Sequence, residues 1–236
     1  MFYLSEKTLS KIFWEKLYES PLVSEAQRDV TKILKYTREI REHFPVGSAG
    51  TISPQSSEQL WLIARYFSPK HIFEIGTFIG RSSFSLLAGS GATLDRIDSC
   101  DASFDQFFIP DEIKQDFSNA QKLNYHPKTP SVKALAQILS LGLCPDFIFI
   151  DGRLCDDDIA LFHKLDPMNT IYVFDDFDGI EKGVENCILL RKRFPELFLI
   201  RPNSDRSIGY GQISILFPPS RVMLSRQQDL PVSLQL

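Results

Sequence analysis

From residue 71 onward, short apolar runs alternate with longer segments whose apolar residues recur at helical spacing. The runs 147–150 and 171–174 are continuously apolar, which is typical of central strands covered on both faces of a sheet. The pattern predicts strands at 71–75, 94–100, 121–125, 146–151, 170–175, 196–201 and 210–217. It predicts intervening helices at 81–89, 105–118, 131–141, 156–165 and 179–193. Such alternation indicates an α/β fold with a doubly wound, mostly parallel sheet.

The end of the chain departs from this alternation. The segment 202–207 between the last two predicted strands is polar and too short for a crossover helix, so these strands should form an antiparallel hairpin. The prediction is a Rossmann-like seven-stranded sheet within a main domain at 48–217. The segment 218–236 has little pattern and is treated as a C-terminal tail.

The first part of the chain has helical periodicity throughout. Pro21 divides it into two predicted helices, and Ser24 with Gln27 forms a plausible capping box for the second. We treat 1–47 as an N-terminal helical extension. It could pack on the main domain, cover the active site as a lid, or join two copies of the chain in a homo-oligomer.

Three further helix starts carry capping signals. Ser56 with Gln59 predicts one start before the first strand, and Asp178 with Glu181 predicts another after the fifth. Ser131 is a natural N-cap for the helix after the third strand.

Composition narrows the class of protein. The chain has 236 residues, 43% of them hydrophobic and 24% charged, which is enough for a sizeable core. A net charge of −4 disfavours a nucleic-acid partner, and no apolar run approaches the roughly 20 residues of a membrane span. No basic region leads an apolar segment at the start, so we expect no secretory signal and a cytoplasmic protein. The four cysteines lack metal-site spacing and are expected to be reduced and mostly buried.

The first predicted strand ends in an acidic residue and a glycine turn. The order Glu74-x-Gly76-x-x-x-Gly80 differs from the Gly-x-Gly-x-x-Gly of dinucleotide enzymes. Glycines there allow close backbone approach to a ligand at a helix start. An acid beside them suits a ligand with a cationic amino group rather than phosphates.

Acidic residues also follow three other predicted strands. The second strand offers Asp98 and Asp101, and we prefer Asp101, at the strand's end, as the acceptor for ribose hydroxyls. Asp151 ends the fourth strand, and Asp175 with Asp176 ends the fifth. Because adjacent parallel strands end side by side, the last three carboxylates should converge. Such a cluster favours a hard cation, Mg²⁺ or Mn²⁺ and also Ca²⁺; the alternative is that Asp175 and Asp176 only shape a turn.

From about residue 48 to 217 the chain resembles the class I S-adenosylmethionine-dependent methyltransferases, in particular the cation-dependent O-methyltransferases of the catechol and caffeoyl-CoA type and related sugar- and antibiotic-tailoring enzymes. The stretches that carry this resemblance are 51–60, 73–80, 146–152 and 174–176.

The resemblance implies a role for each matching residue. Glu74, Gly76 and Gly80 would face the methionine portion of S-adenosylmethionine, with Asp101 at the ribose and Asp151, Asp175 and Asp176 at the metal. Asp151 would thereby be catalytic as well as close to the cofactor. Further cofactor contacts are implied for Thr51, Ser53, Thr77, Ser82 and, at the adenine, Ser131.

One departure from the family concerns the residues after the fourth strand. Related sequences often carry a histidine that serves as base or lines the substrate site, and Leu154 stands there in this chain. Arg153 stays protonated and is a poor base. His126 and His163 are expected to be surface or packing residues. The general base is therefore unassigned.

The resulting hypothesis is methyl transfer from S-adenosylmethionine to a hydroxyl oxygen of a small molecule, assisted by a divalent metal. Two alternatives stay open at this point. One is a binding protein that has the methyltransferase fold without turnover. The other is a nucleotide- or NAD-dependent enzyme on a Rossmann-like sheet, against which the glycine pattern argues.

Overall fold

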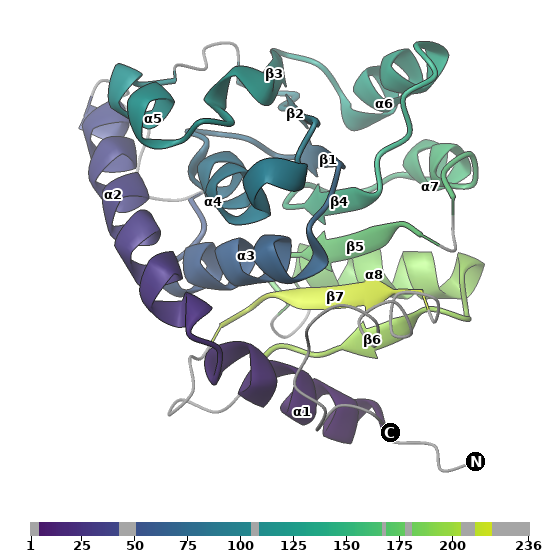
Figure 1. The fold of residues 1–236 in the computed structure, drawn as a ribbon. Coiled ribbons are helices and arrows are strands. Elements are labelled where there is room, and N and C mark those ends of the chain that lie inside the picture. Colours follow the sequence, from purple (N-terminus) through teal and green to yellow (C-terminus); the bar gives the residue numbers. More distant parts are fainter. Residues whose placement is uncertain are drawn as a thin grey trace.

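A computed structural model of the chain describes residues 5–42, 51–104, 109–166, 169–177, 181–203 and 211–218. Seven strands form one sheet in the order β3-β2-β1-β4-β5-β7-β6 (Figure 1). Neighbouring strands from β3 to β5 are parallel, and β7 is antiparallel to both β5 and β6. The predicted doubly wound sheet and terminal hairpin are confirmed. The strands are β1 (His71–Ile75), β2 (Arg96–Cys100), β3 (Leu123–His126), β4 (Phe147–Ile150), β5 (Ile171–Phe174), β6 (Phe198–Ile200) and β7 (Ser214–Phe217).

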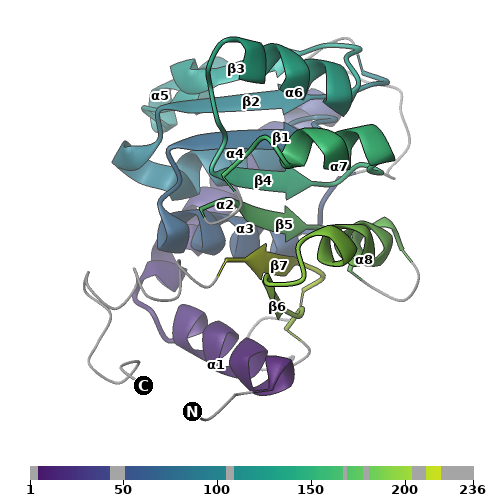
Figure 2. The same ribbon diagram turned by 90° about the vertical axis from the view of Figure 1, so that its right-hand side faces the viewer.

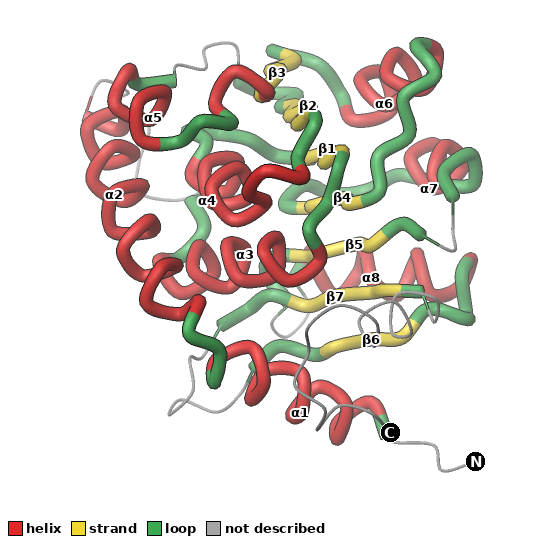
Figure 3. Tube along the Cα trace, in the orientation of Figure 1, coloured by secondary structure: helices red, strands yellow, loops and turns green. Residues whose placement is uncertain are grey.

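Helices cover both faces of the sheet, as Figures 2 and 3 show. On one face lie α2, α3 and α4, and on the other α6, α7 and α8. The helices are α1 (Glu6–Tyr18), α2 (Leu22–Glu42), α3 (Pro54–Phe67), α4 (Arg81–Ser90), α5 (Asp111–Asp116), α6 (Ser131–Ser140), α7 (Asp156–Phe162) and α8 (Lys182–Arg193).

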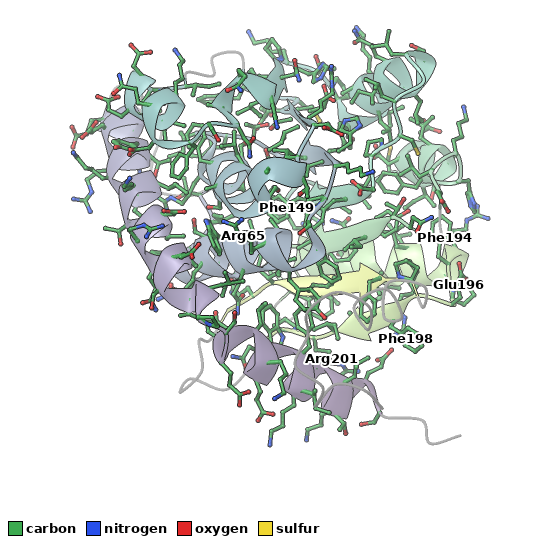
Figure 4. The ribbon with its side chains drawn as sticks, in the orientation of Figure 1. Arg65, Phe149, Phe194, Glu196, Phe198 and Arg201 are labelled. Carbon is green, nitrogen blue, oxygen red and sulfur yellow. The ribbon has the colours of Figure 1, made fainter. Side chains whose placement is uncertain are left out.

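The central strand β4 shows why its sequence is apolar throughout. Phe147 and Phe149 pack into the core beneath α3 and α4, and Phe149 lies near the middle of the molecule in Figure 4. Ile148 and Ile150 point to the opposite face and join the core of α6, α7 and α8. All four side chains are fully buried, which is the burial on both faces that the sequence predicts.

The N-terminal helices pack on the main domain. Helix α2 lies along α3 and α4, and α1 lies against β6, the edge strand of the sheet. The Trp14 indole donates a hydrogen bond to the Arg201 carbonyl at 2.7 Å, and the Arg201 amide donates to the Ser10 hydroxyl at 2.9 Å. Figure 4 marks Arg201 beside α1. Backbone groups at the end of this edge strand are therefore paired rather than open to another chain.

Three predicted helix caps are wrong, and proline explains two of them. Ser53, not Ser56, caps α3 by accepting from the Ser56 amide at 2.9 Å, because Pro54 starts the helix without needing a donor. Pro130 takes the N-cap position of α6, so Ser131 is already helical. Helix α2 begins two residues before Ser24. Glu181 is the N-cap of α8, and the predicted cap at Asp178 lies outside the described residues.

The cysteine prediction holds only in part. All four cysteines are free, as expected, but only two are buried: Cys100 and Cys187 lie in the core, while Cys144 and Cys155 are exposed. Among the described residues, no helix is both long and apolar enough to cross a membrane.

Candidate functional site

The carboxyl ends of β1, β2, β4 and β5 bring the predicted site residues to one edge of the sheet. A small pocket opens there, between the start of α4 and the end of β4. It includes four residues that the sequence assigns to the cofactor, together with an arginine and apolar neighbours. The lining residues are Thr51, Ile52, Thr77, Phe78, Ile79, Arg81, Ser82 and Asp151.

The glycine turn has the backbone shape that the sequence predicts. Gly76 has φ +95° and Gly80 has φ +81°, a region that side chains with a Cβ rarely occupy. A Cβ at Gly76 would lie 3.1 Å from the carbonyl carbon of Asp151. Gly80 is the N-cap of α4, and its amide donates to the Thr77 carbonyl at 2.8 Å. The turn thus places the backbone after β1 directly against that after β4.

Glu74 is completely buried, one residue before the end of β1. Its Oε2 accepts hydrogen bonds from the hydroxyls of Ser83 and of Ser99, the latter at 2.6 Å. Its Oε1 is buried without a hydrogen-bond partner. Burial raises the pKa of Glu74, although the hydroxyls of Ser82, Ser83 and Ser99 partly oppose the rise. A buried acid with one unpaired oxygen marks a place where a donor would be accommodated.

Asp101 lies at the end of β2 and is tied to the glycine turn. Its Oδ2 accepts from the Phe78 amide at 3.0 Å, and its Oδ1 accepts from the amides of Ser103 and Phe104 at 2.8 and 3.0 Å. These bonds fix the carboxylate beside the turn, where the ribose role was predicted. That role stays a prediction.

Asp98, the alternative acid, serves another purpose. It is fully buried and accepts from Arg96 through both carboxylate oxygens, at 2.5 and 2.8 Å. His71 and His126 lie 2.8 and 2.9 Å from the same carboxylate. These three partners outweigh burial and hold the pKa of Asp98 well below its usual range. Because Asp98 is fully buried whereas Asp101 is partly exposed, Asp98 is the poorer candidate for a ribose contact.

Three carboxylates converge as the sequence predicts. One oxygen each from Asp151, Asp175 and Asp176 lies within 4.8 Å of the others. Burial raises the pKa values of Asp151 and Asp175, and repulsion from the neighbouring carboxylates adds to the shift. The Ser56 hydroxyl, at the start of α3, donates to Asp175 at 3.2 Å. Asp176 has φ +53°, so the backbone turns sharply between the two acids.

Lys182 is the site residue that the sequence reasoning missed. Its ammonium lies 2.6 Å from Oδ1 of Asp151 and 3.1 Å from Oδ2 of Asp176. Burial would lower the pKa of Lys182, but attraction to the two carboxylates outweighs it and the pKa rises. A lysine six residues beyond the acidic pair is the only trace of this contact in the sequence, because the contact depends on how α8 approaches the sheet.

Other predicted residues lie elsewhere. Ser131 begins α6 and does not line the pocket formed by the described residues. Leu154, at the position where related enzymes carry histidine, is 9% exposed and packs in the core. His126 bonds Asp98, and His163 is exposed with its ring 4.8 Å from that of Phe194, so one is a packing and the other a surface histidine, as expected.

Comparison with known proteins identifies the fold. No family model and no curated protein matches the sequence. Among the solved structures that share the fold is the O-methyltransferase TomG from Streptomyces achromogenes, in complex with SAM, at 18% identity and a TM-score of 0.54 over 80% of this chain and 89% of that one. Another is cofactor-bound Rv0187 from MTB, at 16% identity and a TM-score of 0.56 over 79% of this chain and 89% of that one. A third is a Bacillus cereus O-methyltransferase in complex with SAH, at 18% identity and a TM-score of 0.52 over 80% of this chain and 90% of that one. The chain therefore has the fold that the resemblance predicts.

Proposed function

We propose that this chain, whose fold is shared with S-adenosylmethionine-bound O-methyltransferases, transfers a methyl group from S-adenosylmethionine to a hydroxyl oxygen of a small molecule. A divalent cation, Mg²⁺ or Mn²⁺ and also Ca²⁺, would be held by Asp151, Asp175 and Asp176. The observation that carries the proposal is the close contact between the glycine turn and Asp151, because it joins a cofactor-type turn to the acidic cluster.

The residues around the turn fit S-adenosylmethionine in charge and shape. Ser82 lines the pocket, and Glu74, whose buried Oε1 is unpaired, lies two residues before Gly76; the cofactor's cationic amino group would complement this acid. The turn itself leaves no side chain at Gly76 or Gly80 to obstruct close approach. Bound there, the cofactor supplies an electrophilic methyl group attached to sulfur.

The acidic cluster fits a hard divalent ion, since it offers only carboxylate oxygens. When bound, such an ion supplies Lewis acidity toward the acceptor hydroxyl. Asp151 belongs to both the pocket lining and the cluster, so it would position the acceptor oxygen next to the cofactor. Leu154 cannot accept the hydroxyl proton, so the proton would pass to solvent or to a base other than Leu154.

Calorimetric titration with S-adenosylmethionine tests this function. We expect the wild-type chain to bind the cofactor, and Asp151→Ala to bind about tenfold more weakly, because the cofactor contact implied for Asp151 would be lost, an effect of the size of one hydrogen bond to a charged group. Asp157→Ala removes an exposed acid at the start of α7 and serves as the matched control, with unchanged binding.

The same titration separates the parts of the proposal. Absence of cofactor binding by the wild-type chain in every condition would contradict the function itself. Binding unaffected by both a chelator and Asp151→Ala would leave a cofactor-binding domain and remove the metal. Product assays on hydroxyl-bearing compounds, read by mass spectrometry, should show addition of one methyl group; cofactor binding without product favours a binding protein.

A further inference from the structure

We propose that the Lys182 ammonium is an internal cation of the carboxylate cluster and competes with a divalent ion for Asp151 and Asp176, a role that rests on the proposed function of the same site. A divalent ion would then bind only as the lysine side chain withdraws. Lys182 would therefore set how tightly the carboxylate cluster binds a divalent ion and which ions it binds.

The contacts of the ammonium define the competition. At 2.6 Å from Asp151 and 3.1 Å from Asp176, Nζ uses one oxygen from each of two of the three acids. A divalent ion needs oxygens of the same carboxylates. An ammonium and a divalent ion bound to the same carboxylates would repel each other strongly in a partly buried site. The third acid, Asp175, is engaged with Ser56 rather than with the lysine.

The fold delivers Lys182 to this place. Lys182 is the first residue of α8, and the next residue, Gly183, packs directly on the turn that carries two of the acids. A Cβ at Gly183 would lie 2.1 Å from the Asp175 carbonyl oxygen and 2.9 Å from that of Asp176. Because only glycine allows this approach, the start of α8 is held against the cluster. The lysine side chain is 26% exposed, which leaves it a route to solvent.

The negative charge of the three carboxylates favours an ammonium at this position. Three carboxylates repel one another here, since one oxygen of each lies within 4.8 Å of the others. One ammonium between two of them offsets part of this repulsion without any bound ion. A divalent ion must therefore displace an existing partner rather than fill an unopposed cluster.

Mn²⁺ binding, followed by electron paramagnetic resonance and calorimetry without cofactor, tests the competition. We expect Lys182→Met to bind Mn²⁺ about tenfold or more tightly than the wild-type chain, because the opposing charge is gone. Lys192→Met removes an exposed lysine from the last turn of the same helix and should bind like wild type. Equal, weaker or absent Mn²⁺ binding by Lys182→Met overturns the proposal.

A second measurement uses the wild-type chain, in case Lys182→Met does not fold. Acetylation of lysines, mapped by mass spectrometry, should modify Lys182 several-fold faster when Mn²⁺ is added, with Lys192 unchanged. No effect of Mn²⁺ on Lys182 overturns the competition. Cofactor titration is read separately: loss of cofactor binding counts against the methyltransferase function, whereas an unchanged Mn²⁺ affinity in a cofactor-binding variant counts only against the role of Lys182.

Discussion

Asp98→Ala is expected to lower the free energy of unfolding by about 3 kcal/mol, measured by urea denaturation at neutral pH. The carboxylate is fully buried between β1, β2 and β3 and is the common partner of His71, Arg96 and His126. Its removal leaves three donors facing one another without an acceptor. Arg96 retains some exposure and can recover part of its hydration, which places the loss at the lower end of values for buried ion pairs.

The effect should depend on pH in a defined direction. The pKa of Asp98 is lower in the folded chain than its ordinary value of about 4, so the carboxylate stabilises the fold fully above that pH. The stabilisation is lost as the pH falls from about 4 toward the folded pKa. The difference between wild type and Asp98→Ala should therefore shrink in acid. Asp95→Ala, at an exposed position just before β2, should change stability by less than about 0.5 kcal/mol; an equal loss in both variants would contradict the role of the buried network.

The centre of the sheet was predictable because strands β4 and β5 are buried on both faces. Runs such as Phe147–Ile150 leave no polar face, so their identification as central strands follows from the apolar pattern alone. Helix starts were less predictable, since Pro54 and Pro130 move the caps of α3 and α6 away from the residues that capping signals favour. A local signal for a cap cannot show which of several neighbouring residues leaves the helix.

The site residues also differ in how far the sequence predicted them. The convergence of Asp151, Asp175 and Asp176 follows from the side-by-side ends of adjacent parallel strands, so sequence position was enough. Lys182 reaches the cluster through the packing of Gly183 on the turn after β5, a contact between helix and loop that no periodicity encodes. Likewise, the place of Asp98 in a buried network depends on its cross-strand partners His71 and His126, which no local pattern indicates.

Gly76→Ala is expected to destabilise the chain by about 2–3 kcal/mol and to weaken S-adenosylmethionine binding at least about tenfold. Two effects add. A residue with a Cβ is strained at φ +95°, and the new Cβ would lie 3.1–3.3 Å from the backbone of Asp151 and Gly152, which must then move. Because Asp151 belongs to both the pocket and the acidic cluster, its displacement disturbs both.

Gly142→Ala isolates the first effect, the backbone strain. Gly142 also has a positive φ, +73°, but a Cβ there would meet nothing within 4 Å. It therefore shares the backbone strain without the crowding, and should lose about 1 kcal/mol while binding the cofactor like wild type. Urea denaturation and calorimetric titration of both variants give the comparison. If Gly76→Ala binds the cofactor as well as Gly142→Ala does, the approach of the turn to Asp151 is not what shapes the cofactor site, and the contact that joins turn and acidic cluster loses its functional meaning.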